Sequence, residues 1–268
     1  MEFKGLNTAF HDIRNASPLI HHITNMVTIN DCANITLAFG GAPVMTDWKE
    51  DALDMVEHAG ALVLNMGTLN PDSIEAMLAA GGRARELGIP IVFDPVGAGA
   101  TAPRRKAARQ ILEGLRPDIV KGNAAEIAFL AGRKVRQKGV DSTLEEGVRE
   151  SVSSLASAFG ITVIATGRED IISDGSNTLQ IRGGSAMMGR ITGTGCMSAS
   201  ALGCFVSVLP SKLEAAAGAI LAMNLAGETA ARALAAEEGS GSFRIRLIDA
   251  ASRMDDSTFF HPERINHV

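Results

Sequence analysis

Short apolar stretches alternate with amphipathic stretches along the first two thirds of the chain. Runs rich in β-branched and other apolar residues, each ending in a glycine-containing turn, lie at 60–67, 89–97, 118–123 and 161–167. Continuous apolar runs of this length are typical of strands in a parallel sheet that is covered on both faces. Segments with helical spacing lie between them at 71–88 and 103–115, the second beginning at Pro103. This alternation predicts right-handed crossovers and a doubly wound α/β fold.

The pattern changes after residue 167. Residues 170–184 contain two short strand-like runs separated by "DGSN", which predicts a hairpin. A glycine-rich loop follows, and then a helix over 195–208 and a second long helix over about 211–235. The chain contains no proline- or serine-rich linker and no internal repeat. We therefore expect one domain that spans residues 1–268.

Composition and charge narrow the class of protein. The chain has 268 residues, of which 46% are hydrophobic and 21% charged, so it can bury a full core. A net charge of −5, an aromatic content of 4% and the absence of tyrosine argue against binding to nucleic acid. The alanine-rich segment 213–239 contains Glu214 and Glu228, which indicates a packed helix rather than a membrane span.

The cysteines indicate the redox environment. Cys32, Cys196 and Cys204 form no CxxC pair, and their odd number leaves one unpaired in any disulfide scheme. We therefore expect reduced thiols and a cytoplasmic location. The first twenty residues mix charged and apolar side chains, so no signal peptide is predicted.

The carboxyl ends of the predicted strands are the expected place for chemistry, because ligands of open α/β sheets bind beyond them. The residues at these ends are Gly67, Asp94, Asn123, Thr166 and the loop at Gly193. That loop, "GTGC" (193–196), opens a helix, so its backbone amides and the helix dipole are suited to holding a phosphate.

The dipole of this helix is expected to lower the pKa of the Cys196 thiol, which would then act as a base or nucleophile. The alternative is that the glycines only permit a tight turn and that Cys196 is a small buried residue. For Cys32 and Cys204, which lie within helical runs, the buried-residue interpretation is favoured.

Two carboxylates form a candidate magnesium site. Asp94 ends one predicted strand, and Glu126 begins the helix that follows the next one. Hydrated Mg²⁺ usually joins a protein through one or two carboxylates, which suits this pair. The alternatives are that Glu126 stabilises its helix dipole and that Asp94 forms a turn. The six histidines show no metal-binding spacing and support no hydrolase triad.

Residues 97–102 have the spacing of a dinucleotide-binding motif, but the surrounding residues argue against dinucleotide binding. Gly97, Gly99 and Ala102 have G-x-G-x-x-A spacing after a strand. The acidic Asp118, however, precedes its apolar run instead of following it, and Asp94 would meet a pyrophosphate with a negative charge. A Walker-type phosphate loop is absent from the sequence.

Taken together, the chain resembles the hydroxyethylthiazole kinase family of the ribokinase-like superfamily. The segments that carry the resemblance, in order, are "ITNMVTINDCANITLAFGGAPVM", "LVLNMGTL", "PIVFDPVGAGAT", "IVKGNAAEI", "VIATGREDIISDG" and "ITGTGCMSASALGCF". Ribokinase-like enzymes usually have an aspartate base as the last residue of the glycine loop. A cysteine there, as at Cys196, is the mark of the thiazole kinases.

The resemblance implies a ribokinase-like three-layer α/β/α sandwich with a mostly parallel central sheet. It also implies transfer of the γ-phosphoryl group of ATP, with Mg²⁺, to the primary alcohol of 4-methyl-5-(2-hydroxyethyl)thiazole for thiamine biosynthesis or salvage. The family is trimeric, so a homotrimer with sites between subunits is implied.

The resemblance also assigns roles to residues. The implied substrate-binding residues are Met45, Asn25, Val27, Gly67 and Gly193. The implied ATP-binding residues are Lys121, Thr166 and Gly195. Cys196 would face the alcohol, and Asp94 and Glu126 would serve the metal. Many members have arginine where this chain has Lys121, so the charge is kept but the bidentate fork is lost.

Three other functions remain open. The first is a related kinase of a pyrimidine or pyridoxine alcohol, against which Cys196 and "NMVT" (25–28) argue. The second is an ADP-dependent hydrate dehydratase, which would be expected to have an aspartate in the loop. The third is a binding or regulatory protein without turnover, which the presence of Asp94, Glu126 and the loop glycines disfavours.

Overall fold

The computed structural model describes residues 3–133 and 141–268, and within them it shows a nine-stranded sheet in the order β2-β1-β3-β4-β5-β6-β7-β8-β9. The strands are β1 (Leu19–Ile23), β2 (Ala42–Met45), β3 (Ala61–Asn65), β4 (Ile91–Asp94), β5 (Ile119–Asn123), β6 (Thr162–Thr166), β7 (Glu169–Ser173), β8 (Thr178–Arg182) and β9 (Ile265–His267). From β2 to β6 neighbouring strands are parallel, and β7, β8 and β9 are added in antiparallel pairings.

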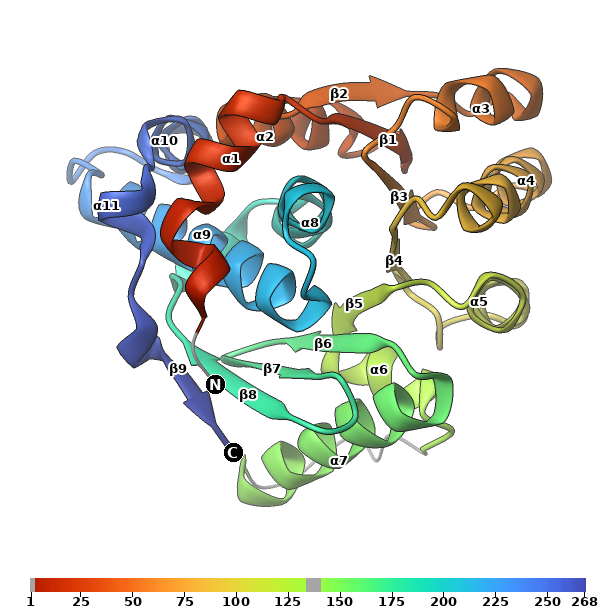
Figure 1. Ribbon diagram of the computed structural model, residues 1–268. Coiled ribbons are helices and arrows are strands. Elements are labelled where there is room, and N and C mark those ends of the chain that lie inside the picture. Colours follow the sequence, from red (N-terminus) through yellow and green to blue (C-terminus); the bar gives the residue numbers. More distant parts are fainter. Residues whose placement is uncertain (1–2, 134–140) are drawn as a thin grey trace.

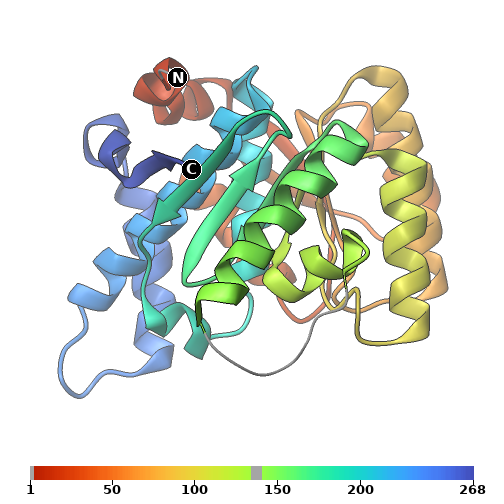
Figure 2. The same cartoon turned by 90° about the horizontal axis from the view of Figure 1, so that it is seen from below.

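Helices cover both faces of this sheet, and each face has its own apolar core. One face is covered by α1 (Ala9–Ala16), α2 (Ile29–Phe39), α8 (Thr194–Val208), α9 (Lys212–Arg232), α10 (Ser240–Arg253) and α11 (Asp256–Phe259). The other is covered by α3 (Lys49–Val56), α4 (Pro71–Leu87), α5 (Ala102–Leu115), α6 (Ala124–Leu130) and α7 (Asp141–Phe159). The sheet curves around α8 and α9 (Figure 1), and α7 runs along the hairpin of β7 and β8 (Figure 2). This is the predicted α/β/α sandwich.

The strands and helices predicted from apolar spacing are confirmed. Each of the four apolar runs contains one of the parallel strands β3, β4, β5 and β6, and the hairpin expected within 170–184 is β7 and β8. The side chain of Asp174 accepts hydrogen bonds from the backbone N–H groups of Ser176 and Asn177, which closes the "DGSN" turn. Every residue of β3 and β4 is buried, as a parallel strand covered on both faces requires.

Helix α8 is apolar on all sides because it lies between the sheet and the helices α2 and α9. Its residues from Met197 to Val206 are all buried. A Cβ atom at Gly203 would come 2.7 Å from Ile20 and 3.0 Å from Val63, so this glycine lets α8 approach β1 and β3 closely. The close approach fixes where the first turn of α8 meets the strand ends. No helix within residues 3–133 and 141–268 is both long and apolar enough to cross a membrane.

Two buried histidines in β1 are expected to make the fold sensitive to acid. Burial lowers the pKa of His21 and of His22 from 6.5 to about 4. Below pH 6.5 the unfolded chain binds a proton at each histidine, while the folded chain does not until about pH 4, so stability falls as the pH falls through this window. For one histidine the full loss is about 3 kcal/mol.

Urea unfolding at pH 7 and pH 4.5 measures this effect, and His22→Gln isolates it. The variant should lose the His22 contribution and therefore show a smaller drop in the free energy of unfolding than the natural chain. The comparison between variants is needed because the buried Asp94, whose pKa is raised to about 6, acts in the opposite direction. Equal drops in both proteins would contradict the assignment to His22.

Candidate active site

A cavity of about 370 Å³ lies beyond the carboxyl ends of the parallel strands, beside the first turn of α8. It brings together the sequence-predicted residues Asn25, Val27, Gly67, Asp94, Lys121, Glu126, Thr166, Gly193, Gly195 and Cys196. Met45, by contrast, is not among the residues that line this cavity. It ends the edge strand β2, where it pairs with His22 of β1.

The glycines at the N-terminus of α8, the capping residue Gly193 and the second helical residue Gly195, have a steric purpose. Gly193 adopts φ +94°, and a Cβ atom there would lie 2.8 Å from Thr28. A Cβ atom at Gly195 would lie 3.0 Å from the amino group of Lys121. Side chains at these positions would therefore close the space between the helix terminus and the cavity, where free backbone N–H groups are suited to binding an anion.

The sulfur of Cys196, the third residue of α8, is held by two side-chain amides. It accepts hydrogen bonds from Asn25 Nδ2 at 3.3 Å and from Asn65 Nδ2 at 3.2 Å. Asn65 Nδ2 also donates to Asp94 Oδ2 at 2.8 Å, and its Oδ1 accepts from Asn25 Nδ2 and from the backbone of Gly67, both at 2.9 Å. One buried amide therefore connects Cys196 to Asp94.

Sequence analysis did not single out Asn65. Asn65 could have been found from its position, because it is the last residue of β3 and pairs with Asp94, the last residue of the neighbouring strand β4. The strand-end argument chose Gly67, two residues further on, because a glycine marks the turn.

The prediction of a lowered pKa for Cys196 is wrong. Burial raises the pKa of this thiol, and the negative charge of Asp94 adds to the rise, while Thr28, Lys121 and Asn25 oppose it. The prediction considered only the field of the helix terminus, and the sequence does not show that the sulfur is covered and faces a carboxylate. At neutral pH the thiol is therefore mainly protonated. Cys32 and Cys204 are buried, as predicted.

Asp94, Lys121 and Glu126 form a charged group at the floor of the cavity. Burial raises the pKa of Asp94 to about 6; the positive charge of Lys121 opposes the rise, and Glu126 adds to it. Lys121 Nζ lies 3.8 Å from Asp94 Oδ2 and donates a hydrogen bond to the carbonyl of Gly195 at 3.0 Å. With two carboxylates near one ammonium group, the cavity is suited to a further cation.

Glu126 also has the structural role given as its alternative. It accepts hydrogen bonds from the backbone N–H groups of Asn123 at 2.7 Å and Gly97 at 2.8 Å, and it forms the capping box of α6 with Asn123. Among the described residues, no group of three or more histidine, cysteine or acidic side chains is arranged to hold a metal. A metal ion here would take most of its ligands from water and substrate.

Arg104, in the first turn of α5, fixes the cavity wall. Its guanidinium group donates to the carbonyls of Met66, Gly67 and Val96 at 2.7 to 2.9 Å. These carbonyls belong to the loops that follow β3 and β4, so one side chain holds both loops in place. Sequence analysis did not find it, because nothing in the sequence distinguishes Arg104 from the other basic residues of its helix.

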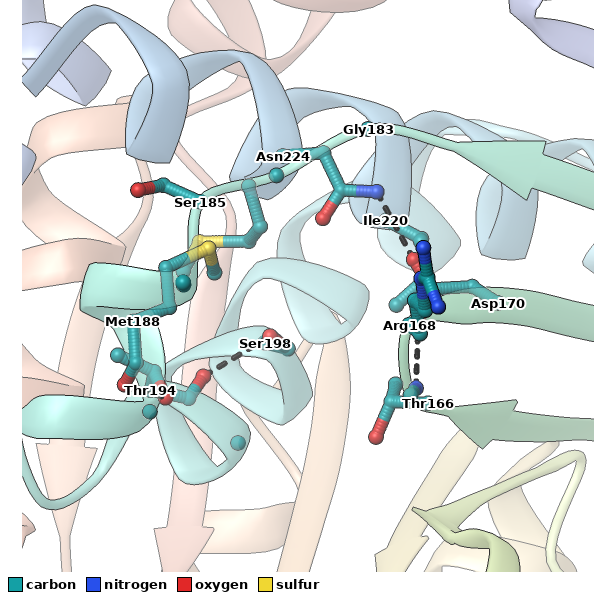
Figure 3. Close-up of a pocket in the computed structure, with 16 residues that line it drawn as sticks. Thr166, Arg168, Asp170, Gly183, Ser185, Met188, Thr194, Ser198, Ile220 and Asn224 are labelled. Atoms are coloured by element: carbon teal, nitrogen blue, oxygen red, sulfur yellow. Dashed lines mark hydrogen bonds between the residues drawn. The ribbon is translucent and has the colours of Figure 1, made fainter. Parts of the chain in front are cut away.

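A second cavity, of about 550 Å³, adjoins the first and shares Thr166 and Gly195 with it. Its walls are the loops at the ends of β6, β7 and β8, the start of α8 and the middle of α9 (Figure 3). Asp170, which is buried there, accepts hydrogen bonds from Asn224 Nδ2 at 2.8 Å and from the backbone N–H of Gly167 at 3.1 Å. The sequence predicted only Thr166 and Gly195 at this cavity.

The mostly parallel sheet with helices on both faces has the ribokinase-like fold. The pyridoxal kinase of Staphylococcus aureus, solved in complex with ADP, shares this fold. It superposes with a TM-score of 0.60 at 15% identity, over 79% of this chain and 88% of the kinase.

Sequence comparison identifies the family within this class. The profile of the Hydroxyethylthiazole kinase family matches residues 10–257. The hydroxyethylthiazole kinase of Alkaliphilus oremlandii is 46% identical over the full length of both chains. The structure of the hydroxyethylthiazole kinase protein from Pyrococcus horikoshii superposes with a TM-score of 0.88 at 36% identity, over 99% of each chain. The chain belongs to the hydroxyethylthiazole kinase family.

Proposed function

We propose that this protein, a single kinase domain over residues 1–268, is a hydroxyethylthiazole kinase. It transfers the γ-phosphoryl group of ATP to the primary alcohol of 4-methyl-5-(2-hydroxyethyl)thiazole, in thiamine biosynthesis or salvage. The observation that carries the proposal is the sulfur of Cys196, which Asn25 and Asn65 hold in the smaller cavity, next to Gly195, a residue that both cavities share. Family membership supports the same substrate.

The two cavities suit the two substrates. The larger one has the size and the mixed polar lining that a nucleoside requires, and the smaller one would hold the thiazole alcohol against Asn25, Val27, Gly67 and Gly193. The boundary between them, at Thr166 and Gly195, is where the phosphates would lie, next to the amides of α8. This arrangement directs the γ-phosphoryl group toward the alcohol beside Cys196.

Charge neutralisation would supply most of the catalysis, because phosphoryl transfer passes through a loose transition state. The ammonium group of Lys121 and the first amides of α8 would stabilise the phosphoryl oxygens. Asp94 and Glu126 would hold a hydrated Mg²⁺, and their fit to it rests on the excess of negative charge they create in a buried site. When bound, this ion neutralises charge on the phosphates of ATP.

Cys196 would orient the alcohol and take its proton late in the transfer, when the forming phosphate ester makes that proton acidic. The thiolate is the form that accepts a proton, and it is a minority at neutral pH because burial raises the pKa. Turnover should therefore increase with pH through the alkaline range. Little proton removal is needed early on a loose path, so a weakly populated thiolate suffices.

We also propose a cytoplasmic homotrimer with its active sites at the subunit interfaces. Apolar side chains are exposed around the smaller cavity and the edge strand: Met26 is 72% exposed, Val27 65% and Trp48 67%. Large apolar side chains that are exposed in the single chain are candidates for burial in an interface. In the trimer Met45, which lies away from the cavity of its own chain, would contact the thiazole of a neighbouring subunit.

Release of ADP from Mg-ATP tests the function, measured with the thiazole alcohol and with a hydroxymethylpyrimidine control. We expect release with the thiazole alcohol and a rate near background with the pyrimidine. Release with the pyrimidine alone would keep the kinase chemistry but overturn the substrate. Release with neither substrate would favour the hydrate dehydratase or the binding protein.

A further inference from the structure

The C-terminal segment supports the larger cavity, although the family profile ends before it, at residue 257. Strand β9 pairs antiparallel with β8, with Ile265 opposite Ile181 and His267 opposite Leu179. Strand β8 leads directly into Gly183 and Gly184, which line the cavity. Residues at the far end of the sequence therefore lie beside the nucleotide site proposed above.

One carboxylate joins the C-terminal segment to this glycine turn. Glu228 of α9 accepts hydrogen bonds at the same oxygen, Oε1, from Arg264 Nη1 at 2.6 Å and from the backbone N–H of Gly184 at 3.0 Å. Its other oxygen lies 3.6 Å from Arg232. The side chain of Arg232 is 69% exposed, whereas those of Arg264 and Glu228 are 30% and 17% exposed. Arg264 is therefore the partner that lies close to the turn.

The glycine turn lies close to this carboxylate and to Arg264, with no room for a side chain between them. Gly184 adopts φ +86°, and a Cβ atom at Gly183 would lie 3.0 Å from Glu228 Oε1 and 3.2 Å from Arg264 Nη1. Figure 3 shows Gly183 next to Asn224, and both residues line the cavity. Asn224 lies on α9, one helical turn before Glu228. The position of the turn, and with it this wall of the cavity, depends on how Glu228 is held.

We propose that Arg264 is a positioning residue for the nucleotide. It fixes Glu228 so that the carboxylate accepts the amide of Gly184 and keeps the Gly183–Gly184 turn in the shape that binds ATP. Without Arg264, Glu228 is free to turn toward the exposed Arg232, and the Gly184 amide loses its acceptor. This inference rests on the proposed kinase function, since it assigns the nucleotide to the larger cavity.

The test compares Arg264→Gln with Arg232→Gln in the full chain. Both variants remove one guanidinium group near Glu228, but only the first one removes the partner beside the turn. We expect Arg264→Gln to raise KM for ATP and the Kd for ADP, measured by calorimetry, about tenfold, with kcat and KM for the thiazole alcohol within about twofold. Arg232→Gln should leave all of these values unchanged, and Arg264→Lys should lie between the two.

Unchanged nucleotide affinity in folded Arg264→Gln would overturn the proposal, and so would an equal loss in Arg232→Gln. An equal rise in KM for ATP and for the thiazole alcohol would also overturn the proposal, because Arg264 would then only support the fold in general. Thermal melting checks that each variant is folded, and Arg264→Lys keeps the proposal open to refutation if the glutamine variant does not fold. If the natural chain binds ADP but phosphorylates no alcohol, the kinase function fails while the effect of Arg264 on ADP remains measurable.

Discussion

Replacing Lys121 by methionine is expected to lower kcat/KM for ATP by about 10²- to 10³-fold, the loss typical of removing a group that stabilises transition-state charge. Among the described residues that line the smaller cavity, Lys121 carries the only positive charge. It is 3% exposed, and it lies between Asp94 and the carbonyl of Gly195 in the first turn of α8. Methionine has nearly the same shape, so the substitution removes the charge and leaves the packing.

Lys121→Arg is the matched control, because arginine keeps the positive charge at this position. We expect it to stay within about tenfold of the natural enzyme, since the charge is kept and only the hydrogen-bond geometry changes. Steady-state kinetics with varied ATP measures both variants, and melting curves check folding. A methionine variant with natural kcat/KM would show that Lys121 does not act on the phosphates, whatever its effect on Asp94.

Parallel strands could be predicted from the sequence only where they are apolar throughout. Strands β3 to β6 show as unbroken apolar runs because both of their faces are covered. Strand β1 is just as buried, but His21 and His22 interrupt its apolar run, so no strand was predicted there. The polar β9 was missed for a different reason: it is a strand only because β8 offers it a partner.

Site residues could be predicted where their position at the end of a strand determines where they lie in the fold. The strand-end rule and the resemblance found most of the residues that line the smaller cavity, but not Thr28, Val96 and Thr192. Asn65 and Arg104 were missed because their roles arise from contacts across the fold, with Cys196 and with the carbonyls of two loops. The larger cavity is built mainly from loops at the ends of the antiparallel strands, and no local motif marks those loops as one surface.

The contacts of Cys196 explain how a weakly acidic thiol could serve the proposed reaction at this position. Two amide groups donate to the sulfur, so its position is set by Asn25 and Asn65 whether or not it is ionised. Asn65 in turn binds Asp94, which places the sulfur at a fixed distance from the proposed magnesium site. In the proposed mechanism the enzyme therefore relies on orientation of the thiol more than on its acidity, as a loose transition state allows.

Replacing Cys196 by alanine is expected to lower kcat about 10²-fold, at the lower end of the range for a positioned base, and to leave KM for ATP nearly unchanged. Alanine removes the sulfur without disturbing the helix, whose backbone amides still face the phosphates. Cys204→Ala is the matched control, since this cysteine is buried in the same helix and does not line the cavity. Equal turnover in Cys196→Ala and the natural chain would refute the role of the thiol as base.

The variant Cys196→Asp tests whether the side chain at position 196 acts as a base or only fills space. Its carboxylate is ionised at a lower pH than the thiol and supplies the aspartate base that the resemblance to ribokinase-like enzymes implies, so we expect turnover at neutral pH to equal or exceed that of the natural enzyme. The pH profile should also change: the natural enzyme gains turnover as the pH rises through the alkaline range, because the pKa of its thiol is raised, whereas the aspartate variant should already be level at neutral pH. The measurement is kcat from pH 6 to pH 10 for both proteins. A folded but inactive Cys196→Asp would contradict the expectation that a carboxylate can replace the thiol, and two profiles of the same shape would show that the sulfur does not take the proton.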